Sequence, residues 1–264
     1  MPVALHRMYR YPVKGMTGES LEHVALRAGE RLPGDRRFAI AHGGTTGPET
    51  RFEWRPRSDF LMLARNERLA LLEARYNETS CTLTLLRHGR SVARGNPGET
   101  LGRAVIEQFF AAFMGTELRG APKLVEAAEG GFTDSREGWL SLINLASVRD
   151  LERVVRAPID PLRFRANLYI DGLAPWRERD WVGGEIAVGA ARLRVMECIT
   201  RCAATNVNPA TGARDLNIPL ALQQGIGRGE MGVYAKVITA GTIAAGDAVA
   251  LPFDEARGEA SLSA

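Results

Sequence analysis

The sequence predicts an α+β fold that is predominantly β, with a barrel-like arrangement of strands and a few helices packed on it. Many short apolar runs are bounded by glycine, proline or polar turns, which is typical of strands. Few segments show the 3.6-residue period of an amphipathic helix. The 264 residues are 45% hydrophobic and 25% charged, which favours an ordinary globular protein and excludes a mainly disordered, collagen-like or coiled-coil chain.

The first third of the chain is expected to form mainly strands. They are an extended piece over Tyr9–Lys14, strands over Leu21–Leu26 and Arg36–Ala41, and a strand over Cys81–Leu86 whose apolar residues alternate with threonines. Glycine-rich and polar loops are expected over 43–47 and 88–98.

One long helix follows these strands. Its apolar stripe recurs at helical spacing and consists of Val105, Ile106, Phe109, Phe110, Phe113 and Met114. We expect Thr100 to cap the start of the helix and Gly115 to end it. The stretch 115–123 is then a join between two parts of the chain.

The second half is predicted to mix short strands with two short helices. A polar loop covers 130–138, and Ser147 has the form of an N-cap because Asp150 stands three positions later. The expected elements are strands over Leu142–Leu145, Asn167–Ile170, Glu185–Val188, Ala191–Val195 and Val233–Ile238, helices over Val148–Val155 and Pro219–Gln224, a glycine turn and last strand within Gly241–Leu251, and a loose tail over 256–264.

Charge and cysteine content exclude several classes of protein. The net charge of +3 is too small to indicate a nucleic-acid partner. Three cysteines, an odd and low number, argue against a disulfide framework and fit a reducing compartment. No run of about 18 apolar residues and no signal-peptide pattern is present, so we expect no membrane span and a cytoplasmic location.

The segment 196–212 is the densest in chemically capable residues. Cys198 and Cys202 stand four residues apart, Thr200 offers a hydroxyl, and Arg201 precedes Cys202. A neighbouring guanidinium favours the thiolate, which is the form that binds a soft metal or takes part in sulfur transfer. The spacing alone is equally compatible with two cysteines in the core. No histidine stands at zinc-site spacing from the pair.

Three basic segments could bind an anion. Lys14 stands beside Gly15 after a proline, where a phosphate can approach the backbone. Strand alternation places Arg36 and Arg37 on opposite faces, so one of the two can face a site. Arg163 and Arg165 share a face. Taken singly, each of these basic residues also fits an exposed position or a surface ion pair.

Five motifs occur in order from about Arg10 to Leu251: YPVKG, GDRRF, LRFRANLYI, C-x-x-R-C followed by TNVNPATG, and MGVYAKV before a glycine turn. As an ordered set they resemble the MOSC family, named for the C-terminal domain of molybdenum-cofactor sulfurase. The resemblance is closest to the branch that has an extra N-terminal β-barrel region and includes the mitochondrial amidoxime-reducing component.

This resemblance implies a molybdenum cofactor, in which a pterin dithiolene holds molybdenum and its other end carries a phosphate. Cys202 matches the cysteine that ligates the metal and serves catalysis. The implied cofactor-binding residues are Lys14, Gly15, Arg36, Asn144, Ser147, Arg165, Thr200, Arg201 and Tyr234. Ser147, as a helix N-cap, would also suit an anion or act simply as a cap. The cysteines are separated by three residues here and by two in close relatives, which leaves the role of Cys198 open.

The implied function is a molybdenum-dependent oxidoreductase that reduces N-hydroxylated compounds: N-hydroxy bases, amidoximes or hydroxylamines. No cysteine follows Cys202, so the chain lacks the four-cysteine cluster that some bacterial relatives append. We therefore expect a separate electron donor, ferredoxin-like or a flavin reductase. The alternatives are a sulfur-carrier or cofactor-delivery protein with a persulfide on Cys202, and a binding module without catalysis.

Two domains are predicted. Residues 1–120 form a smaller N-terminal β-barrel-like domain and residues 121–255 a MOSC β-barrel domain with helices packed on it. Lys14 and Arg36 must reach a site built otherwise from the second half. Strands before about residue 40 are therefore expected to contribute to the second domain, and the stretch from about 40 to 120 is expected to be an insertion.

Overall fold

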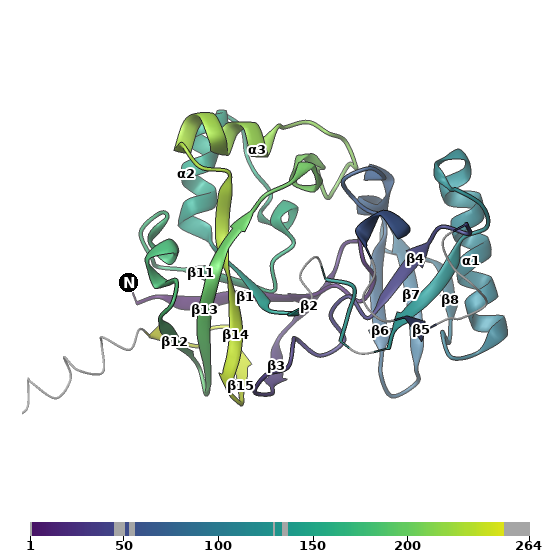
Figure 1. Cartoon of the computed structure of the whole chain (residues 1–264), viewed down its shortest axis with the longest axis horizontal. Helices are drawn as coiled ribbons and strands as arrows, with labels where there is room; N and C mark the ends of the chain where they lie inside the picture. Colours follow the sequence, from purple (N-terminus) through teal and green to yellow (C-terminus); the bar gives the residue numbers. More distant parts are fainter. Residues whose placement is uncertain (1, 45–50, 53–55, 129, 134–136, 251–264) are drawn as a thin grey trace, which may run out of the picture.

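The computed structural model describes residues 2–44, 51–52, 56–128, 130–133 and 137–250, and Figure 1 shows their arrangement. Part of the predicted loop over 43–47, part of the predicted loop over 130–138, and the tail over 256–264 lie outside the described residues. Strands dominate, and the predicted α+β, predominantly β class is confirmed.

The largest sheet in the described ranges has eight strands and forms the larger half of the molecule (Figure 1). Its order is β16 (Val249–Ala250), β12 (Glu185–Val188), β13 (Ala191–Thr200), β14 (Glu230–Thr239), β10 (Leu140–Asn144), β11 (Leu168–Asp171), β1 (Ala4–Arg10) and β2 (Glu19–Leu21). The pair β10–β11 is parallel, and the other pairs are antiparallel. A separate pair joins β3 (His23–Leu26) to β15 (Gly241–Ala244).

Helical segments accompany this sheet. They are α2 (Leu145–Val155), α3 (Ile218–Ala221), the π-helical turn η7 (Leu222–Ile226), and the 3₁₀ turns η4 (Pro161–Phe164), η5 (Arg177–Trp181) and η6 (Ala203–Asn206). Val148 and Leu151 of α2 pack with Ile218, Leu222 and Tyr169 into one buried cluster. The helices therefore cover apolar residues of the sheet, as the barrel-like prediction requires.

The smaller half contains two three-stranded sheets and the long helix. One sheet has the order β4 (Phe38–Ala41), β9 (Lys123–Ala127), β5 (Arg51–Phe52), and the other is β6 (Glu73–Asn77), β7 (Thr82–Arg87), β8 (Arg90–Gly95). The helix is α1 (Thr100–Met114), and the 3₁₀ turns are η1 (Arg57–Asp59), η2 (Glu67–Leu71) and η3 (Gly115–Glu117). Ile106, Phe110 and Phe113 of α1 bury their side chains with Leu83 and Leu85 of β7, which accounts for the predicted apolar stripe.

Strand pairing crosses the predicted domain boundary in both directions. β1 and β2 from the start of the chain complete the eight-stranded sheet, and β9, which follows residue 120, pairs with β4 and β5. The division at residue 120 stays a prediction. The two halves are tied together by backbone hydrogen bonds, and residues of both can therefore contribute to one site.

Several element boundaries differ from the sequence predictions, among them those of β1, α1 and β13. β1 ends at Arg10, and the following stretch leaves the sheet so that the Lys14 amide donates to the Phe38 carbonyl over 2.8 Å. Thr100 is the first residue of α1 rather than its cap, although Gly115 ends the helix as predicted. β13 continues five residues beyond its predicted end at Val195, to Thr200, and so leads directly to Cys202.

Ser147 is not the N-cap of α2, and the predicted start of that helix is wrong. The helix begins at Leu145, because the Asn144 side-chain oxygen accepts a hydrogen bond from the Ala146 amide at 3.0 Å. Asparagine is as good an N-cap as serine. The S-x-x-D pattern therefore pointed to the wrong one of two competent residues.

Within the described ranges, no helix combines the length and the apolar character that crossing a bilayer requires.

Gly102 in α1 lies against the chain before the helix, and we expect Gly102→Ala to destabilise the protein. A Cβ there would sit 2.2 Å from the Asn96 carbonyl oxygen. Alanine favours a helix by about 1 kcal/mol over glycine, but the backbone clash should cost roughly 1–3 kcal/mol and reverse the sign. Urea unfolding measures the change. Gly44→Ala, where a Cβ meets nothing within 4 Å, is the control. A more stable Gly102→Ala variant would contradict the packing described here.

Candidate functional site

A cleft lies between the two halves of the molecule. Its empty volume is about 1010 Å³ with its open mouth included. The lining comes from seven regions of the chain: Lys14 and Gly15; Arg36; Arg57 and Met62–Ala64; Thr133, Trp139 and Ser141; Arg163–Arg165 and Asn167; Ile199–Cys202, Ala204 and Thr205; and Tyr234. Binding sites for small molecules commonly lie in such clefts between parts of a fold.

Eight of the ten site residues predicted from the sequence line this cleft. They are Lys14, Gly15, Arg36, Arg165, Thr200, Arg201, Cys202 and Tyr234. The exceptions are Asn144 and Ser147, which are buried elsewhere. The lining residues missing from the prediction include Arg57, Trp139, Ser141, Arg163 and Asn167. Arg163 is one of the basic residues that the sequence offers for anion binding, and Asn167 stands in the same LRFRAN segment, so this segment carries a usable signal.

The electrostatic character of the cleft is strongly positive. Six of its described lining residues carry a cationic side chain, namely Lys14, Arg36, Arg57, Arg163, Arg165 and Arg201, and none carries a carboxylate. A cleft lined by charges of one sign raises the local concentration of the opposite charge. The arrangement therefore suits an anionic ligand.

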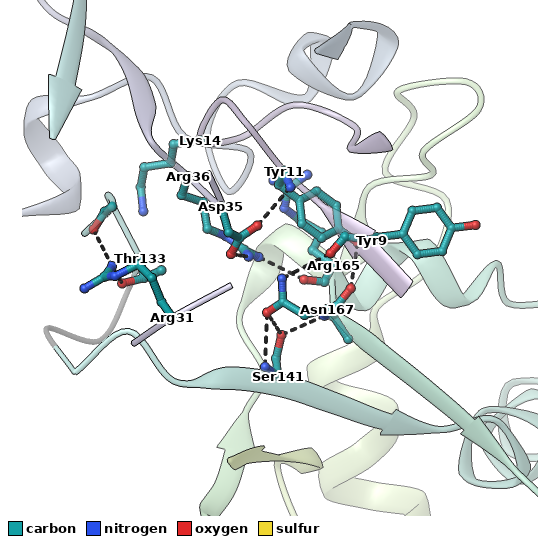
Figure 2. Close-up of polar contacts among 12 residues, drawn as sticks. Tyr9, Tyr11, Lys14, Arg31, Asp35, Arg36, Thr133, Ser141, Arg165 and Asn167 are labelled. Carbon is teal, nitrogen blue, oxygen red and sulfur yellow. Dashed lines mark hydrogen bonds and ion pairs between the residues drawn. The ribbon is translucent and has the colours of Figure 1, made fainter. Parts of the chain in front are cut away.

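Arg36 and Arg165 lie against the same aromatic ring (Figure 2). Each guanidinium carbon is 4.6 Å from the ring centroid of Tyr11, which is buried. Arg36 donates to the Arg165 carbonyl over 2.9 Å and to the Asp35 carboxylate, and Arg165 donates to the Met16 carbonyl. Burial, reinforced by the positive charge of Arg36, lowers the pKa of Arg165 to about 10, so this side chain is still charged near neutral pH.

The backbone gives both arginines their direction. Arg36 has φ of 50° and Arg165 has φ of 51°, a left-handed conformation that residues other than glycine adopt at a cost. Arg36 precedes β4, and Arg37 turns away to Glu126 with Nε to Oε1 at 2.8 Å. Arg36 and Arg37 thus point in different directions, as predicted. The left-handed backbone of Arg36 accounts for this, because neither residue belongs to β4.

Tyr11 and Asp35 form the support beneath these arginines. The Tyr11 amide donates to Asp35 over 2.8 Å, and the Tyr11 hydroxyl donates to the Ala166 carbonyl over 3.1 Å. Burial raises the pKa of Tyr11 to about 12, so the ring remains neutral. Asp35 is only 4% exposed, and its carboxylate offsets part of the positive charge of Arg36.

Lys14 and Gly15 approach the same region from the smaller half. Lys14 Nζ donates to the Phe132 carbonyl over 2.9 Å, while Arg31 holds the same loop by donating to the Gly131 carbonyl over 3.1 Å (Figure 2). Gly15 has φ of 87°, a conformation that favours glycine. This backbone conformation accounts for glycine at position 15.

Asn167 and Ser141 form the polar floor of the cleft. The Asn167 side-chain oxygen accepts from the Ser141 amide and hydroxyl, at 3.1 and 3.0 Å, and its nitrogen donates to the Tyr9 carbonyl over 3.2 Å. These bonds join β10, β1 and the start of β11. Tyr234 of β14 stands opposite Ser141 in register, and its ring lies 6.2 Å from that of Trp139.

Arg201 keeps one hydrogen-bond donor unused within the described structure. Its Nε donates to the Met231 carbonyl over 2.8 Å and its Nη1 to the Phe164 carbonyl over 3.0 Å, which fixes the guanidinium. Nη2 is buried and has no hydrogen-bond partner there. Burial lowers the pKa of Arg201 to about 10. A buried unpaired donor is costly, so this nitrogen is suited to accept an anionic ligand as its partner.

Cys202 is exposed and stands just beyond the end of β13. Its carbonyl accepts from the Thr205 amide at 3.1 Å and from the Thr205 hydroxyl at 2.8 Å. Arg214 braces the same loop against the smaller half by donating to the carbonyls of Ala203 over 3.2 Å and Ala64 over 2.9 Å. The backbone is therefore fixed while the thiol remains on the cleft.

Cys198 has a different environment from Cys202. It packs against the core of the large sheet and does not line the cleft. Burial raises the pKa of the Cys198 thiol, so it is less suited to be a thiolate. In the described residues, no three side chains of His, Cys, Asp or Glu gather as a metal site of their own. A protein ligand to a metal in this cleft would be the single thiolate of Cys202.

Asn144 and Ser147 surround a buried carboxylate instead of the cleft. Asn144 donates to Glu178 over 3.0 Å, and the Ser147 hydroxyl lies 2.8 Å from Glu178 Oε1. The N-terminus of α2 favours negative charge, and the chain supplies that charge itself with Glu178. In the structure this helix end faces Glu178 and does not line the cleft, and a cofactor contact of Asn144 or Ser147 stays a prediction.

Comparisons with known proteins match both halves. Residues 129–250 match the family model described as the MOSC domain, and residues 3–115 match the one described as the MOSC N-terminal beta barrel domain. A stretch of 80 residues is 36% identical to mitochondrial amidoxime-reducing component 1 of Mus musculus. That stretch is 30% of this chain and 23% of the mouse protein, so the chain matches less than a quarter of that relative's length.

Two solved structures are similar at low identity. YiiM from Geobacillus stearothermophilus is 20% identical, with 42% of this chain and 53% of that chain covered and a TM-score of 0.34. The YuaD protein from Bacillus subtilis is 12% identical, with 94% of each chain covered and a TM-score of 0.42. Both TM-scores are below 0.5.

Burial raises the pKa of Glu178, and we expect Glu178→Gln to change how stability depends on pH. A carboxyl with a raised folded-state pKa stabilises the fold below its unfolded pKa and loses that contribution as pH rises through the folded value. Glutamine cannot ionise. The stability of the variant relative to the wild type should therefore improve as the pH rises above about 4.5.

Urea unfolding from pH 4 to 8 measures this difference, with Glu197→Gln on the exposed side of β13 as the control. If the wild-type and Glu178→Gln stabilities follow parallel pH curves, the buried carboxylate is not ionising as described.

Proposed function

The chain belongs to the MOSC-domain proteins that also carry a MOSC N-terminal beta barrel domain, and we propose on this basis that its cleft binds a molybdenum cofactor. One observation carries the proposal. An exposed thiol, Cys202, shares a cleft with six cationic side chains and, among the described lining residues, with no carboxylate. That combination suits a ligand with a soft metal at one end and an anionic group at the other.

The residues present fit both ends of such a cofactor. Lys14, Arg36 and Arg165 converge from separate segments and would hold the phosphate of the pterin. The unpaired Nη2 of Arg201 offers a further donor to an anionic group. Cys202 would hold the metal, because a soft metal favours a thiolate ligand. Thr200 and Tyr234 would meet the cofactor from β13 and β14.

We propose that the reaction is the reduction of N-hydroxylated compounds such as N-hydroxy bases, amidoximes or hydroxylamines. The nitrogen–oxygen bond breaks, two electrons and two protons are consumed, and the oxygen leaves as water. The bound cofactor supplies the two-electron and oxygen-acceptor chemistry, as cofactors generally do. The similarity to the mouse amidoxime-reducing component supports this choice of substrate class.

The chain itself binds and orients. Arg36 and Arg165 are fixed by Tyr11, Asp35 and backbone carbonyls, so little side-chain entropy is lost when an anion binds. The loop of Cys202 is fixed through Thr205 and Arg214. Electrons come from a separate protein in this proposal, ferredoxin-like or a flavin reductase, and both act in the cytoplasm.

A sulfur-carrier function is the second candidate, and the exposure of the Cys202 thiol favours it. In that case Cys202 would carry a persulfide, or the cleft would hold the cofactor only for delivery. Intact-protein mass spectrometry distinguishes the two, since a persulfide adds one sulfur atom to Cys202. Firmly bound molybdenum together with reduction of an N-hydroxylated compound supports the enzyme.

Replacing Cys202 by serine tests the proposed metal ligand. We expect Cys202→Ser, expressed with molybdate, to lose activity and to bind molybdenum more weakly by a factor of about 100 or more, since outer partners of metal ligands alone account for about 10–100-fold. Metal analysis and the visible absorption spectrum measure this. Cys81→Ser, at an exposed turn of the smaller half, is the matched control. Equal molybdenum content and identical spectra in wild type and Cys202→Ser would remove the thiolate ligand.

Replacing Lys14 by glutamine tests the phosphate end. The variant keeps a polar side chain but loses one charge, and charge-assisted hydrogen bonds contribute about 1.5–3 kcal/mol. We therefore expect cofactor affinity to fall about tenfold or more. Molybdenum retained after dialysis against phosphate buffer is the readout. Lys236→Gln, on an exposed position of β14, should retain as much as the wild type. Equal retention in both variants would show that Lys14 does not hold the cofactor.

A further inference from the structure

Arg57 differs from the other cations of the cleft. It lies in η1 of the smaller half and is exposed, and within the described structure its guanidinium has neither a hydrogen-bond nor an ion-pair partner. The other five cations are held by protein groups. Lys14 donates to a carbonyl, Arg36 to Asp35, Arg163 to Asp215, Arg165 to the Met16 carbonyl, and Arg201 to two carbonyls. Among the described lining residues, Arg57 is thus the cation whose guanidinium has no partner in the described structure.

The position of Arg57 separates it from the proposed phosphate-binding residues. Lys14 is attached at the start of β4, where its amide donates to Phe38, and Arg36 comes just before that strand. η1 is attached at the other end of β4, where Ala41 bridges to Phe60. Three residues of strand separate the two attachment points, a distance of about 10 Å along the strand. Arg57 therefore enters the cleft from a different place than Lys14 and Arg36, and it is placed to meet a second anionic group of a bound ligand.

The charges of the cleft also leave an excess. Asp35 and Asp215 compensate two of the six cations from outside the lining. A phosphate monoester supplies about −1.5 to −2 charges. The Cys202 thiolate supplies one more negative charge, so a small net positive charge remains once the phosphate and the thiolate are accounted for. Among the described lining residues no carboxylate is available to receive a cationic substrate such as a protonated amidine.

We propose that the cleft selects N-hydroxylated substrates that carry an anionic group such as a carboxylate, and that Arg57 binds this group. This inference rests on the proposed function and assigns a substrate class to it. A guanidinium matches a carboxylate through two parallel hydrogen bonds. Because Arg57 is exposed at the cleft, a substrate can reach it without displacing a partner from the part of the chain that the structure describes.

The test uses the full chain loaded with molybdenum cofactor and a chemical reductant. Two substrates share one reacting group: benzamidoxime, which has no carboxylate, and 4-carboxybenzamidoxime, which has one. We expect the wild type to have the higher kcat/KM for the carboxylate. Arg57→Gln should reduce that preference by on the order of tenfold, the size of one charged hydrogen bond. Arg57→Lys should keep part of it.

Arg90→Gln is the matched control, because Arg90 is exposed on β8 and does not line the cleft. It should leave the substrate preference of the wild type unchanged. Raising the salt concentration should weaken the preference in the wild type more than in Arg57→Gln, since exposed charges are screened. A preference that is the same in Arg57→Gln and wild type overturns the inference.

Two further measurements separate this inference from the proposed function. Metal analysis of Arg57→Gln should show wild-type molybdenum content, and a loss of molybdenum would make Arg57 a cofactor contact and overturn the inference. Calorimetry with benzoate and benzamide should show tighter benzoate binding to the loaded wild type, and a drop of about tenfold in Arg57→Gln. If neither amidoxime is reduced, the proposed function fails, and the benzoate measurement still decides the role of Arg57.

Discussion

Bringing like charges together is the constraint on which the cleft depends. Six cations line one space, and their mutual repulsion has to be offset by groups that the fold supplies. Tyr11 is central, because two guanidiniums lie against its ring and Asp35 accepts from both the Tyr11 amide and Arg36. Cation–π contacts and a buried carboxylate offset part of the repulsion without filling the cleft.

The support of these cations comes largely from backbone atoms. The carbonyls of Met16, Phe132, Phe164, Arg165 and Met231 all accept from lining cations. Carbonyl groups are dipoles and carry no net charge. They orient a guanidinium while leaving its positive charge available to a ligand. These carbonyl contacts explain how the cleft can be strongly positive while its cationic side chains keep defined positions.

The sequence allowed the class of fold to be predicted, and its short motifs contain many of the residues that line the cleft, because both depend on local patterns. Alternating apolar residues indicated β7 and β14, and ordered short motifs carried eight of the ten site residues. The failures have physical reasons. Ser147 and Asn144 are both good caps, and only the fold shows that Glu178 occupies the end of α2. The left-handed backbone of Arg36 and Arg165 gives no signal in their residue types. Arg57 has no motif around it, and only the folded chain brings it to the cleft.

Arg214 links the smaller half to the loop that contains Cys202. Its guanidinium joins Ala203, next to Cys202, to Ala64 and to the Glu67 carboxylate in the smaller half. The backbone next to Cys202 is therefore held by a segment that stands 138 positions earlier in the chain, at Ala64. The smaller half cannot be exchanged for an unrelated module, in evolution or in engineering, without also redesigning the loop that presents the sulfur.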